Sequence, residues 1–417
     1  MRELLFLCHR LPYPPNKGDK IRSYHLLRHL AENYRVHLGT FVDEPEDWQH
    51  VAAVEKLCAG SCIRPLKPLA ARLRALIALA RAEPFTVAYY RDRSMQRWVD
   101  GVLSAGTVET VVAFSSGMAP YLLRGRGPRR IMDFVDVDSD KWRQYAQTRG
   151  GIAGMIYRRE AGYLADFEQR IAAACDASVF VSGHEAEFFR QRVPGLSARI
   201  HGIPNGVDTE YWDPALDYPN PYGTAAPVLV FVGAMDYWAN AEGAQWFART
   251  VWPRIHRELP AAHFYIVGAN PSRPVRALAA VEGIVVTGRV ADVRPYVRHA
   301  HAVVAPLRIA RGIQNKVLEA LAMGKALLAT PQAYEGIEEF AERPGCISDA
   351  PEILAGEALR WLRETRPAAF PAVRQQVLSR YNWRRMLARF DSLLEAAPVA
   401  DRSAAESGAA RTREAYP

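Results

Sequence analysis

The chain has 417 residues, of which 49% are hydrophobic and 24% charged. This composition is close to the average for soluble globular proteins and excludes a disordered, collagen-like or disulfide-scaffold chain. The length predicts two domains of about 200 residues each. We find no uncharged apolar run of about 18 residues and no signal-peptide pattern, so we expect a cytoplasmic protein. The five cysteines form no CxxC pair, which predicts reduced structural thiols.

The formal net charge of +8 is distributed unevenly along the chain. Residues 1–204 carry 29 Lys/Arg against 22 Asp/Glu, whereas residues 205–417 carry 24 against 23. A basic first half indicates an anionic partner, which by charge alone is a nucleic acid, an anionic lipid or a phosphorylated substrate.

The first half begins with an apolar strand at 3–9, a loop of turn-forming residues and an amphipathic helix at 21–34. Apolar strands separated by helical stretches predict a buried parallel sheet. The further strands expected in this half are 35–42, 110–114, 130–135 and 177–182. A segment dense in Pro, Gly, Asn and Asp, 201–223, predicts an interdomain linker.

The alternation restarts after this segment and predicts a second doubly wound α/β domain. Its expected strands are 228–235, 262–269, 283–290, 301–307 and 326–330, and its expected helices are 240–259 and 313–324. A last helix at 382–397 precedes a tail that we expect to be disordered. The expected organisation is a first domain at 1–204, a linker at 205–224, a second domain at 225–380, a crossing helix at 381–397 and the tail at 398–417. Such a pair of domains predicts an active site in the cleft between them, at the carboxyl ends of both sheets.

Two loops have the composition of anion sites. In the first, Lys17, Gly18 and Lys20 lie where a helix begins, so cations, free amides and the helix dipole coincide. It has neither GxGxxG nor the Walker spacing, and a plain strand-to-helix turn explains it equally well. In the second, Arg308, Arg311 and the amides around Gly312 precede a helix and suit a diphosphate.

Lys316 and Glu319 lie three residues apart on the helix that follows, so they share a face. The lysine can hold a phosphate, and the glutamate can accept hydrogen bonds from ribose hydroxyls. The alternative is a surface Lys/Glu pair on an amphipathic helix, which stabilises a helix by only about 0.2 to 0.5 kcal/mol.

Several motifs, taken together and in order, resemble a known enzyme family. They are IPNGVDTEYW (203–212), FVGAMD (231–236), YIVGANP (265–271), VTGRVADVRPYV (286–297), PLRIARGIQNKVLEALAMGKALLAT (306–330) and the closing YNW with its helix (381–397). The combination resembles the family 4 nucleotide-sugar glycosyltransferases, which have the GT-B fold of two Rossmann-like domains facing each other across a cleft. The resemblance covers residues 1–397. More narrowly, the first loop, MDFVDVDSDKW (132–142) and RGIQNKVLEALAMG (311–324) resemble the sugar transferases of exosortase-associated exopolysaccharide loci.

The resemblance implies transfer of a sugar, with retention of anomeric configuration and without a metal or other cofactor. The implied donor is a UDP- or GDP-type nucleotide sugar, and the implied acceptor is a saccharide or a polyprenyl-linked oligosaccharide. The second domain would bind the donor and the returning C-terminal helix would reach the first domain. The implied donor-binding residues are Gly18, Gly233, Val290, Gly312, Ile313, Gln314, Asn315 and Glu319, and the implied catalytic residues are Asp136, Arg311 and Lys316.

Two positions depart from the family pattern. The family usually has a glutamate eight residues before the one at 319, but here Arg311 stands in its place. We hypothesise that Arg311 supports the diphosphate or a donor carboxylate. In the first domain the family usually has a His-Asp pair, whereas this chain has Asp133, Asp136 and Asp138. Asp136 aligns best and is our candidate for the acceptor-side acid/base group.

His9 and His25 are the alternatives to Asp136, although a histidine in a strand or an amphipathic helix is more often structural. The three aspartates could also suggest a metal site, but they have no further ligand on a clear metal-binding loop, and we do not favour one.

The segment 63–85 predicts a basic amphipathic helix. Its apolar stripe comprises Leu69, Leu73, Leu76, Ile77 and Ala80, with Arg72, Arg74 and Arg81 nearby. Such a helix can lie on an anionic membrane, which predicts peripheral contact through 68–82 at the inner face of the cell membrane. The alternative is a helix that packs its apolar stripe on its own sheet. The nearby Tyr89, Tyr90 and Trp98 would suit nucleic acid, but no nucleic-acid-binding module accompanies them, so we expect no such partner.

Two other functions fit the same fold. One is a nucleotide-sugar epimerase or a phosphorylase, although a phosphorylase would need a cofactor lysine and a longer chain. The other is a non-catalytic nucleotide-sugar-binding subunit of a polysaccharide assembly complex, and Arg311 in place of the usual glutamate keeps it open. The base, the sugar, the acceptor, the linkage and the oligomeric state have no portable sequence code.

Overall fold

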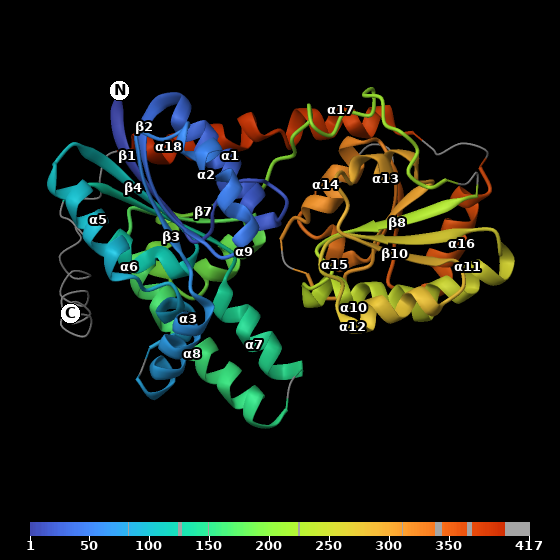
Figure 1. The fold of residues 1–417 in the computed structure, drawn as a ribbon, viewed down its shortest axis with the longest axis horizontal. Coiled ribbons are helices and arrows are strands. Elements are labelled where there is room, and N and C mark those ends of the chain that lie inside the picture. The colour runs from blue at the N-terminus through green and yellow to red at the C-terminus, as the bar shows by residue number, and fades with distance from the viewer. Residues whose placement is uncertain are drawn as a thin grey trace. The chain divides into compact units, whose positions relative to one another are not determined.

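A computed structural model describes residues 1–81, 83–123, 127–148, 150–223, 226–310, 312–337, 344–364 and 369–396. The chain forms two compact units: Met1–Pro204 together with the chain from Leu387 onward, and Asn205–Met386. Both are α/β units built on a parallel sheet, as the sequence predicts (Figure 1). Among the described residues, none of the helices has the length and apolar character needed to cross a bilayer. The expected tail lies outside the described residues.

The first unit contains a seven-stranded parallel sheet in the order β3-β2-β1-β4-β5-β6-β7. Residues 4–8 of its central strand are fully buried, because helices cover both faces of such a sheet. The strands are β1 (Arg2–Cys8), β2 (Tyr34–Val42), β3 (Gly60–Pro65), β4 (Val108–Phe114), β5 (Arg129–Val135), β6 (Ala177–Phe180) and β7 (Ile200–Gly202). The helices are α1 (Gly18–Asn33), η1 (Pro45–His50), α2 (Val51–Glu55), α3 (Pro68–Ala80), α4 (Phe85–Tyr89), α5 (Arg93–Ser104), η2 (Ser116–Met118), α6 (Ala119–Leu122), α7 (Asp138–Thr148), α8 (Gly151–Ala174), α9 (Gly183–Arg190), η3 (Pro194–Arg199) and α18 (Trp383–Glu395), most of which belongs here.

The second unit contains a six-stranded parallel sheet in the order β10-β9-β8-β11-β12-β13. Its strands are β8 (Val228–Val232), β9 (His263–Val267), β10 (Ile284–Gly288), β11 (Ala302–Ala305), β12 (Ala326–Ala329) and β13 (Gly345–Ile347). Its helices are α10 (Trp238–Trp246), η4 (Phe247–Val251), α11 (Trp252–Glu258), α12 (Arg273–Ala277), η5 (Leu278–Ala280), α13 (Arg294–His299), α14 (Asn315–Ala322), α15 (Pro331–Tyr334), α16 (Pro351–Leu362) and α17 (Pro371–Arg380). This strand order is the doubly wound order of dinucleotide-binding domains.

The segment expected to link the domains packs on the second unit. Its aromatic residues Trp212, Tyr218 and Tyr222 are buried in that unit's core. Arg374 Nη1 donates to the backbone oxygen of Trp212 at 2.9 Å, and Arg294 lies over the ring of Tyr211 at 3.8 Å. The turn-forming residues prevent regular structure, but the aromatic side chains bury enough apolar area to fix the segment.

The helical stretch expected at 240–259 is continuous but not uniform. It begins as α10, passes through the π-helical turn η4 and continues as α11. Pro253 is in the first turn of α11, where it has no N–H to donate. The wider turn before a proline accommodates its ring within the helix.

The C-terminal helix α18 is tied to the first unit by side chains far away in sequence. Arg129 Nε donates to the backbone oxygen of Leu393 at 2.5 Å, and His29 Nε2 lies 2.6 Å from Asp391 Oδ1. Arg389 donates to the backbone oxygen of Gly202 at 3.0 Å. The chain therefore returns to its first unit after completing the second.

A buried ion pair joins α1 to β5. Arg22 Nε donates to Asp133 Oδ2 at 2.9 Å, and the carboxylate is fully buried. A second nitrogen of the same guanidinium donates to the backbone oxygen of Ile203 at 2.9 Å. Burial raises the pKa of Asp133, and the charge of Arg22 opposes that rise. Asp133 therefore has a structural partner and is not available as one of three metal ligands.

We predict that Asp133→Ala lowers the free energy of unfolding by about 3 kcal/mol, because it leaves the Arg22 charge buried without its carboxylate. Urea denaturation of the full chain measures this. The matched control is Glu187→Ala, which removes an exposed pair with Arg190 and should change stability by less than about 0.5 kcal/mol. A loss below about 1 kcal/mol in Asp133→Ala would contradict a stabilising role for the buried pair.

Candidate functional site

Glycines at the carboxyl edge of the second sheet leave the backbone there uncovered by side chains. The strand order reverses between β8 and β11, and ligands of doubly wound sheets bind beyond the carboxyl ends of the strands at this reversal. Gly233 N donates to Val267 O at 3.0 Å, and Gly268 N donates to Gly288 O at 3.1 Å. A Cβ on Gly268 would lie 1.7 Å from Gly233 O, so a side chain cannot be accommodated there. A row of glycines at this edge lets a ligand approach the backbone closely.

Lys316 is held beside the end of β8. Its Nζ donates to Asn240 Oδ1 at 2.5 Å and lies 5.3 Å from the centre of the Phe231 ring. Asn240 is fixed in turn, because its Nδ2 donates to Ala234 O at 2.8 Å. A Cβ on Gly233 would meet this amide at 2.8 Å, so the close packing of Asn240 depends on a glycine. Sequence reasoning placed Lys316 on this helix but missed Asn240, which positions it.

Glu319 follows Lys316 by three residues on α14, as the sequence predicts, and both side chains are half-buried. Burial raises the pKa of Glu319 and lowers that of Lys316, and in each case the charge of the other residue opposes the shift. Each residue therefore favours its neutral form more than it would in water. An anion bound at Lys316 would favour the protonated form of its amine.

The loop before α14 has the geometry of an anion site. Gly312 has a φ of 62°, in the left-handed region that favours glycine, and Gln314 Nε2 donates to its backbone oxygen at 3.2 Å. Among the described residues no side chain caps the first turn of α14. Val317 N donates to Gln314 O at 2.9 Å, so the amides before it are the ones that a ligand could reach. Asn315 Oδ1 accepts from Asn205 Nδ2 at 2.9 Å, while Asn315 Nδ2 is buried without a hydrogen-bond partner among the described residues. Ile313 is buried in the core of the second unit.

Two arginines were expected next to this loop. Arg308 is exposed and pairs with Glu242 at 3.3 Å, so part of its charge is already neutralised. Arg311 lies outside the described residues. Val290 follows β10 and packs partly buried against the core of the second unit.

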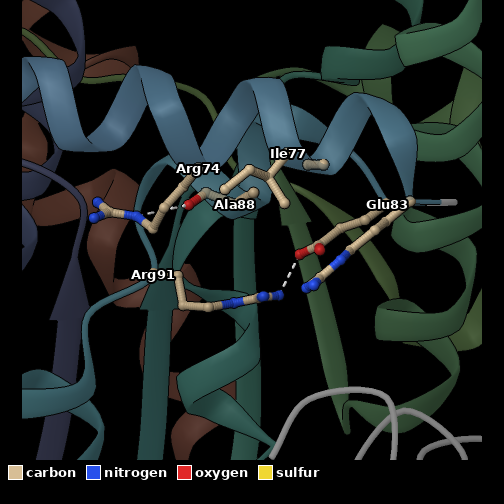
Figure 2. A pocket seen from close by; sticks show the side chains of 7 residues that line it. Arg74, Ile77, Glu83, Ala88 and Arg91 are labelled. Atoms are coloured by element: carbon tan, nitrogen blue, oxygen red, sulfur yellow. Dashed lines mark hydrogen bonds and ion pairs between the residues drawn. The ribbon is translucent and has the colours of Figure 1, made fainter.

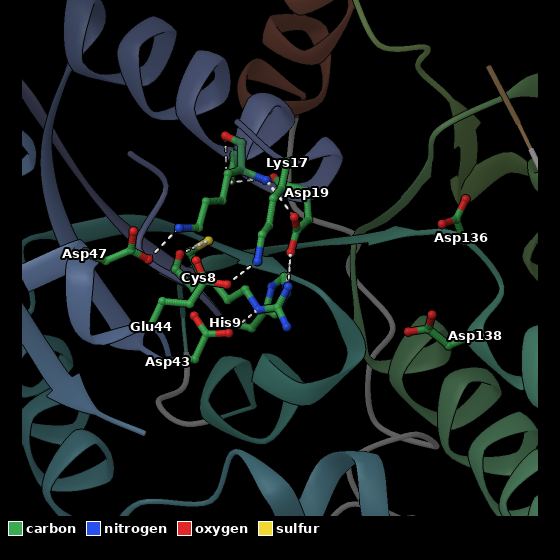
Figure 3. Close-up of polar contacts among 12 residues, drawn as sticks. Cys8, His9, Lys17, Asp19, Asp43, Glu44, Asp47, Asp136 and Asp138 are labelled. Atoms are coloured by element: carbon green, nitrogen blue, oxygen red, sulfur yellow. Dashed lines mark hydrogen bonds and ion pairs between the residues drawn. The ribbon is translucent and has the colours of Figure 1, made fainter. Parts of the chain in front are cut away.

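The lysines of the first-domain loop form ion pairs with carboxylates of the same unit. Gly18 begins α1, while Lys17 forms an ion pair with Glu44 and the buried Lys20 forms one with Asp47 (Figure 3). The composition of the loop predicted the cations, but their carboxylate partners lie about 27 residues away along the chain. Both charges are therefore compensated within the first unit.

His9 forms a pair with Asp19 where the first sheet reverses its strand order, between β1 and β4. His9 Nε2 lies 3.2 Å from Asp19 Oδ2, and the ring stacks on Phe114, the last residue of β4. Burial raises the pKa of Asp19, but the hydrogen bond and charge of His9, with the charge of Arg10, hold it well below its usual range. The other ring nitrogen of His9 is buried without a hydrogen-bond partner among the described residues. His25, the other alternative, is buried in α1.

Asp136 and Asp138 both pair with Lys141, at 2.6 and 3.3 Å, and Figure 3 shows them apart from the ion pairs around His9. In the described parts of the chain no group of three His, Cys, Asp or Glu side chains is arranged to hold a metal.

The backbone is strained at the ends of two neighbouring strands of the first unit. Val135, directly before Asp136, has a φ of 70°, and Ser115, after β4, has a φ of 77°. A β-branched residue in this region is an outlier, and such strain is concentrated at functional sites. The sequence could not reveal it, because backbone angles at a strand end depend on the packing around it.

The comparisons with known proteins agree with this architecture. Residues 226–364 match the family described as Glycosyl transferases group 1, so the second unit carries that family's sequence pattern. No curated protein is similar enough in sequence to give a match.

Three solved structures illustrate the likeness of the whole fold. HepE from Anabaena, in complex with UDP and glucose, is similar with a TM-score of 0.65 and 13% identity, over 94% of this chain and 99% of that one. WaaG, a glycosyltransferase involved in lipopolysaccharide biosynthesis, gives 0.63 and 15%, over 94% and 100%. A glycosyltransferase from Rickettsia africae gives 0.61 and 13%, over 95% and 100%. The fold of the chain is therefore the GT-B fold.

We predict that Lys316 loses its proton at a pH below the ordinary lysine value of about 10.4. Burial lowers the pKa of its amine, so the neutral form gains population as the pH rises from 7 to 9. NMR titration of isotope-labelled lysines measures this, and the signal missing from Lys316→Arg assigns the resonance. A Lys316 signal that titrates at the ordinary value would show that the amine is not withdrawn from water.

Proposed function

We propose that the protein is a retaining, metal-independent glycosyltransferase that uses a nucleotide-diphosphate sugar. The observation that carries this proposal is Lys316, a half-buried amine fixed by Asn240 where the second sheet reverses its strand order. The match of residues 226–364 to the group 1 glycosyl transferases supports it, since that segment includes Lys316. The structures of HepE with UDP and with UDP-glucose support a UDP-type donor, with GDP as the alternative base.

In this proposal the second unit holds the donor. The diphosphate lies against Gly312, Ile313, Gln314 and Asn315 and receives a hydrogen bond from Lys316. Glu319 accepts hydrogen bonds from the ribose hydroxyls, and Gly233 and Val290 border the nucleotide. Because the amine and the helix amides are fixed beforehand, they stabilise charge as it develops on the leaving diphosphate. Arg311 joins the diphosphate site on the evidence of its sequence position alone.

The reaction replaces one bond at the anomeric carbon. The acceptor hydroxyl oxygen bonds to that carbon on the side from which the diphosphate departs, so the configuration is retained. The bond from the carbon to the diphosphate oxygen breaks with its electron pair. The hydroxyl proton passes to the acceptor-side base or, if that group only positions the acceptor, to the departing diphosphate. No protein nucleophile takes part.

Asp136 is the proposed acceptor-side acid/base or positioning group. Its ion pair with Lys141 keeps a carboxylate fixed directly after the strained Val135. His9, oriented by Asp19, is the competing candidate, because a carboxylate that holds a histidine in one orientation is a common arrangement of a general base. The role of Gly18 stays a prediction from the resemblance of its loop.

The proposed acceptor is a growing polysaccharide or a lipid-linked oligosaccharide of exopolysaccharide synthesis. The sequence resemblance to exosortase-associated sugar transferases supports it. The likeness of the fold to WaaG, which is involved in lipopolysaccharide biosynthesis, is compatible with a cell-surface glycan.

We predict that UDP or GDP raises the melting temperature of the wild type, and that of Lys316→Ala by no more than about half as much at the same concentration. At 100 times the dissociation constant, a ligand stabilises the folded state by about 2.7 kcal/mol. Removing a charge-assisted hydrogen bond should weaken binding at least about tenfold. A thermal-shift titration with UDP, GDP, CDP and dTDP measures this and identifies the base.

The matched control is Arg360→Ala, which removes an exposed cation of α16 in the same unit and should keep the full shift. If no nucleotide shifts the wild type at millimolar concentration, the donor site is wrong. If Lys316→Ala responds as the wild type does, Lys316 is not part of it.

We predict that the glycosylated product keeps the anomeric configuration of the donor sugar, and that Asp136→Asn lowers kcat by about 100-fold or more with little change in nucleotide affinity. Proton NMR of the product gives the configuration, and His9→Gln is measured in parallel. An inverted product would exclude same-side attack. Loss of activity in His9→Gln but not in Asp136→Asn would transfer the acid/base role to His9. Normal nucleotide binding without transfer or hydrolysis would indicate a non-catalytic subunit.

A further inference from the structure

Helix α3 presents its large apolar side chains to solvent, unlike an ordinary amphipathic helix of a water-soluble unit, which buries them. Its small residues Ala71 and Ala78 are buried against the protein, with at most 1% of their area exposed. Its large apolar residues face solvent, with exposed fractions of 82% for Leu69, 60% for Leu73, 62% for Leu76 and 46% for Ile77. The side chain of Ala80, the fifth member of the expected stripe, lies outside the described residues. The alternative in which this stripe packs on its own sheet is therefore wrong.

A second helix adds to the exposed apolar area. Near the start of α8, Ile152 is 78% and Met155 63% exposed. Arg159, one turn after Met155, donates to the backbone oxygens of Ala78 and Arg81 at 2.8 Å, at the end of α3. Since residues three and four apart share a helix face, Ile152 and Met155 lie on the same side of α8 as Arg159, next to α3. We call the six exposed apolar residues of these two helices the α3–α8 surface: Leu69, Leu73, Leu76, Ile77, Ile152 and Met155.

The two segments that carry this surface have no acidic residue between Glu55 and Glu83 or between Asp140 and Glu160. Residues 56–82 contain six Lys/Arg and residues 141–159 contain five, and neither segment contains an Asp or a Glu. Three of these eleven cations are paired with carboxylates outside the two segments: Arg64 with Asp92, Lys141 with Asp136 and Arg143 with Asp140. Lys67, Arg72, Arg81 and Arg158 are exposed beside the apolar residues. A partner that covers the surface must therefore accept apolar side chains and carry negative charge.

A hollow of about 160 Å³ lies at the edge of the surface, beneath α3 (Figure 2). Ile77 lines it together with Arg74, Arg81, Glu83 and Arg91. Arg74 Nη2 donates to the backbone oxygen of Tyr89 at 3.0 Å, and Arg91 forms an ion pair with Glu83. Three guanidinium groups against one carboxylate leave an excess of positive charge next to the exposed isoleucine.

We propose that the α3–α8 surface binds the surface of an anionic lipid bilayer. Its leucines, isoleucines and methionine would enter the boundary between headgroups and acyl chains, and the cations around them would meet lipid phosphates. A second copy of the chain fits less well, because it would bring two sets of exposed arginines together without a carboxylate between them. Six large apolar side chains exposed on two packed helices are more than the singly scattered apolar residues that are normal on a soluble surface.

Co-sedimentation of the full chain with vesicles tests this. Wild type should bind vesicles of phosphatidylcholine with 30% phosphatidylglycerol and bind pure phosphatidylcholine vesicles at least about tenfold more weakly, because each cation near an anionic surface adds about 1 kcal/mol. Leu73→Gln/Leu76→Gln should lower the partition coefficient at least about tenfold, since it removes two side chains from the apolar contact. Arg72→Gln/Arg81→Gln should lower binding to the anionic vesicles about tenfold and leave binding to neutral ones unchanged.

The matched control is Ile347→Gln/Ile353→Gln, which changes two apolar residues of the second unit with similar exposure, 47% and 52%. It should bind as the wild type does. All these positions are exposed, so the variants should keep the wild-type melting temperature, which is checked first. Membrane binding requires no donor, so a nucleotide thermal shift on the same variants separates failure here from failure of the donor site.

Three results would overturn the proposal. In the first, wild type stays in the supernatant with anionic vesicles. In the second, the wild type and the Leu73→Gln/Leu76→Gln variant sediment equally with anionic vesicles. In the third, sedimentation velocity shows a dimer of the wild type that this double variant abolishes, which would make the surface an interface between copies of the chain.

Discussion

In a parallel sheet whose strand order reverses, the loops after the two strands at the reversal lead to opposite sides. The crevice between these loops, at the carboxyl ends of the two strands, is where ligands bind. In the second unit these strands are β8 and β11, and the lysine, its asparagine partner and the loop proposed to hold the phosphates belong to loops or helices that follow them, whereas Val290 follows β10. Gly233 and Asn240 follow β8, and the loop at Gly312 and α14 follow β11. The strand order of the sheet thus determines where the lysine and the helix amides lie.

The same principle organises the first unit with different chemistry. There, His9 follows β1 and stacks on the end of β4, and the loop cations are paired with carboxylates of the same unit. The second unit instead keeps a lysine whose partner is a neutral amide. Lys316 has no direct ion pair among the described residues, and only the nearby charge of Glu319 offsets its own, so an anionic ligand gains more from Lys316 than from Lys17 or Lys20.

The sequence predicted most of the strands and the doubly wound class because fully buried strands read as continuous apolar runs. It missed β3, β7 and β13, which are only partly buried. It also predicted that Lys316 and Glu319 share a helix face, because helical spacing is local. It could not predict the Asn240 contact, the Arg22–Asp133 pair or the partners of the loop lysines, because these join residues that only the tertiary fold brings together. The segment before β8 was interpreted as a linker because turn formers dominate it, although its aromatic residues decide its packing. The amphipathic pattern predicted the apolar stripe on α3, but it could not predict whether that stripe faces the protein or the solvent.

The central claim is that a nucleoside diphosphate binds at the carboxyl ends of β8 and β11. A crystal structure of the chain with UDP, or with the base that stabilises it most, tests this most directly. The account predicts the diphosphate against the backbone of residues 312–315, within hydrogen-bond distance of Lys316 Nζ, and the ribose against Glu319. A nucleotide bound elsewhere, with Lys316 still bonded only to Asn240, would contradict it.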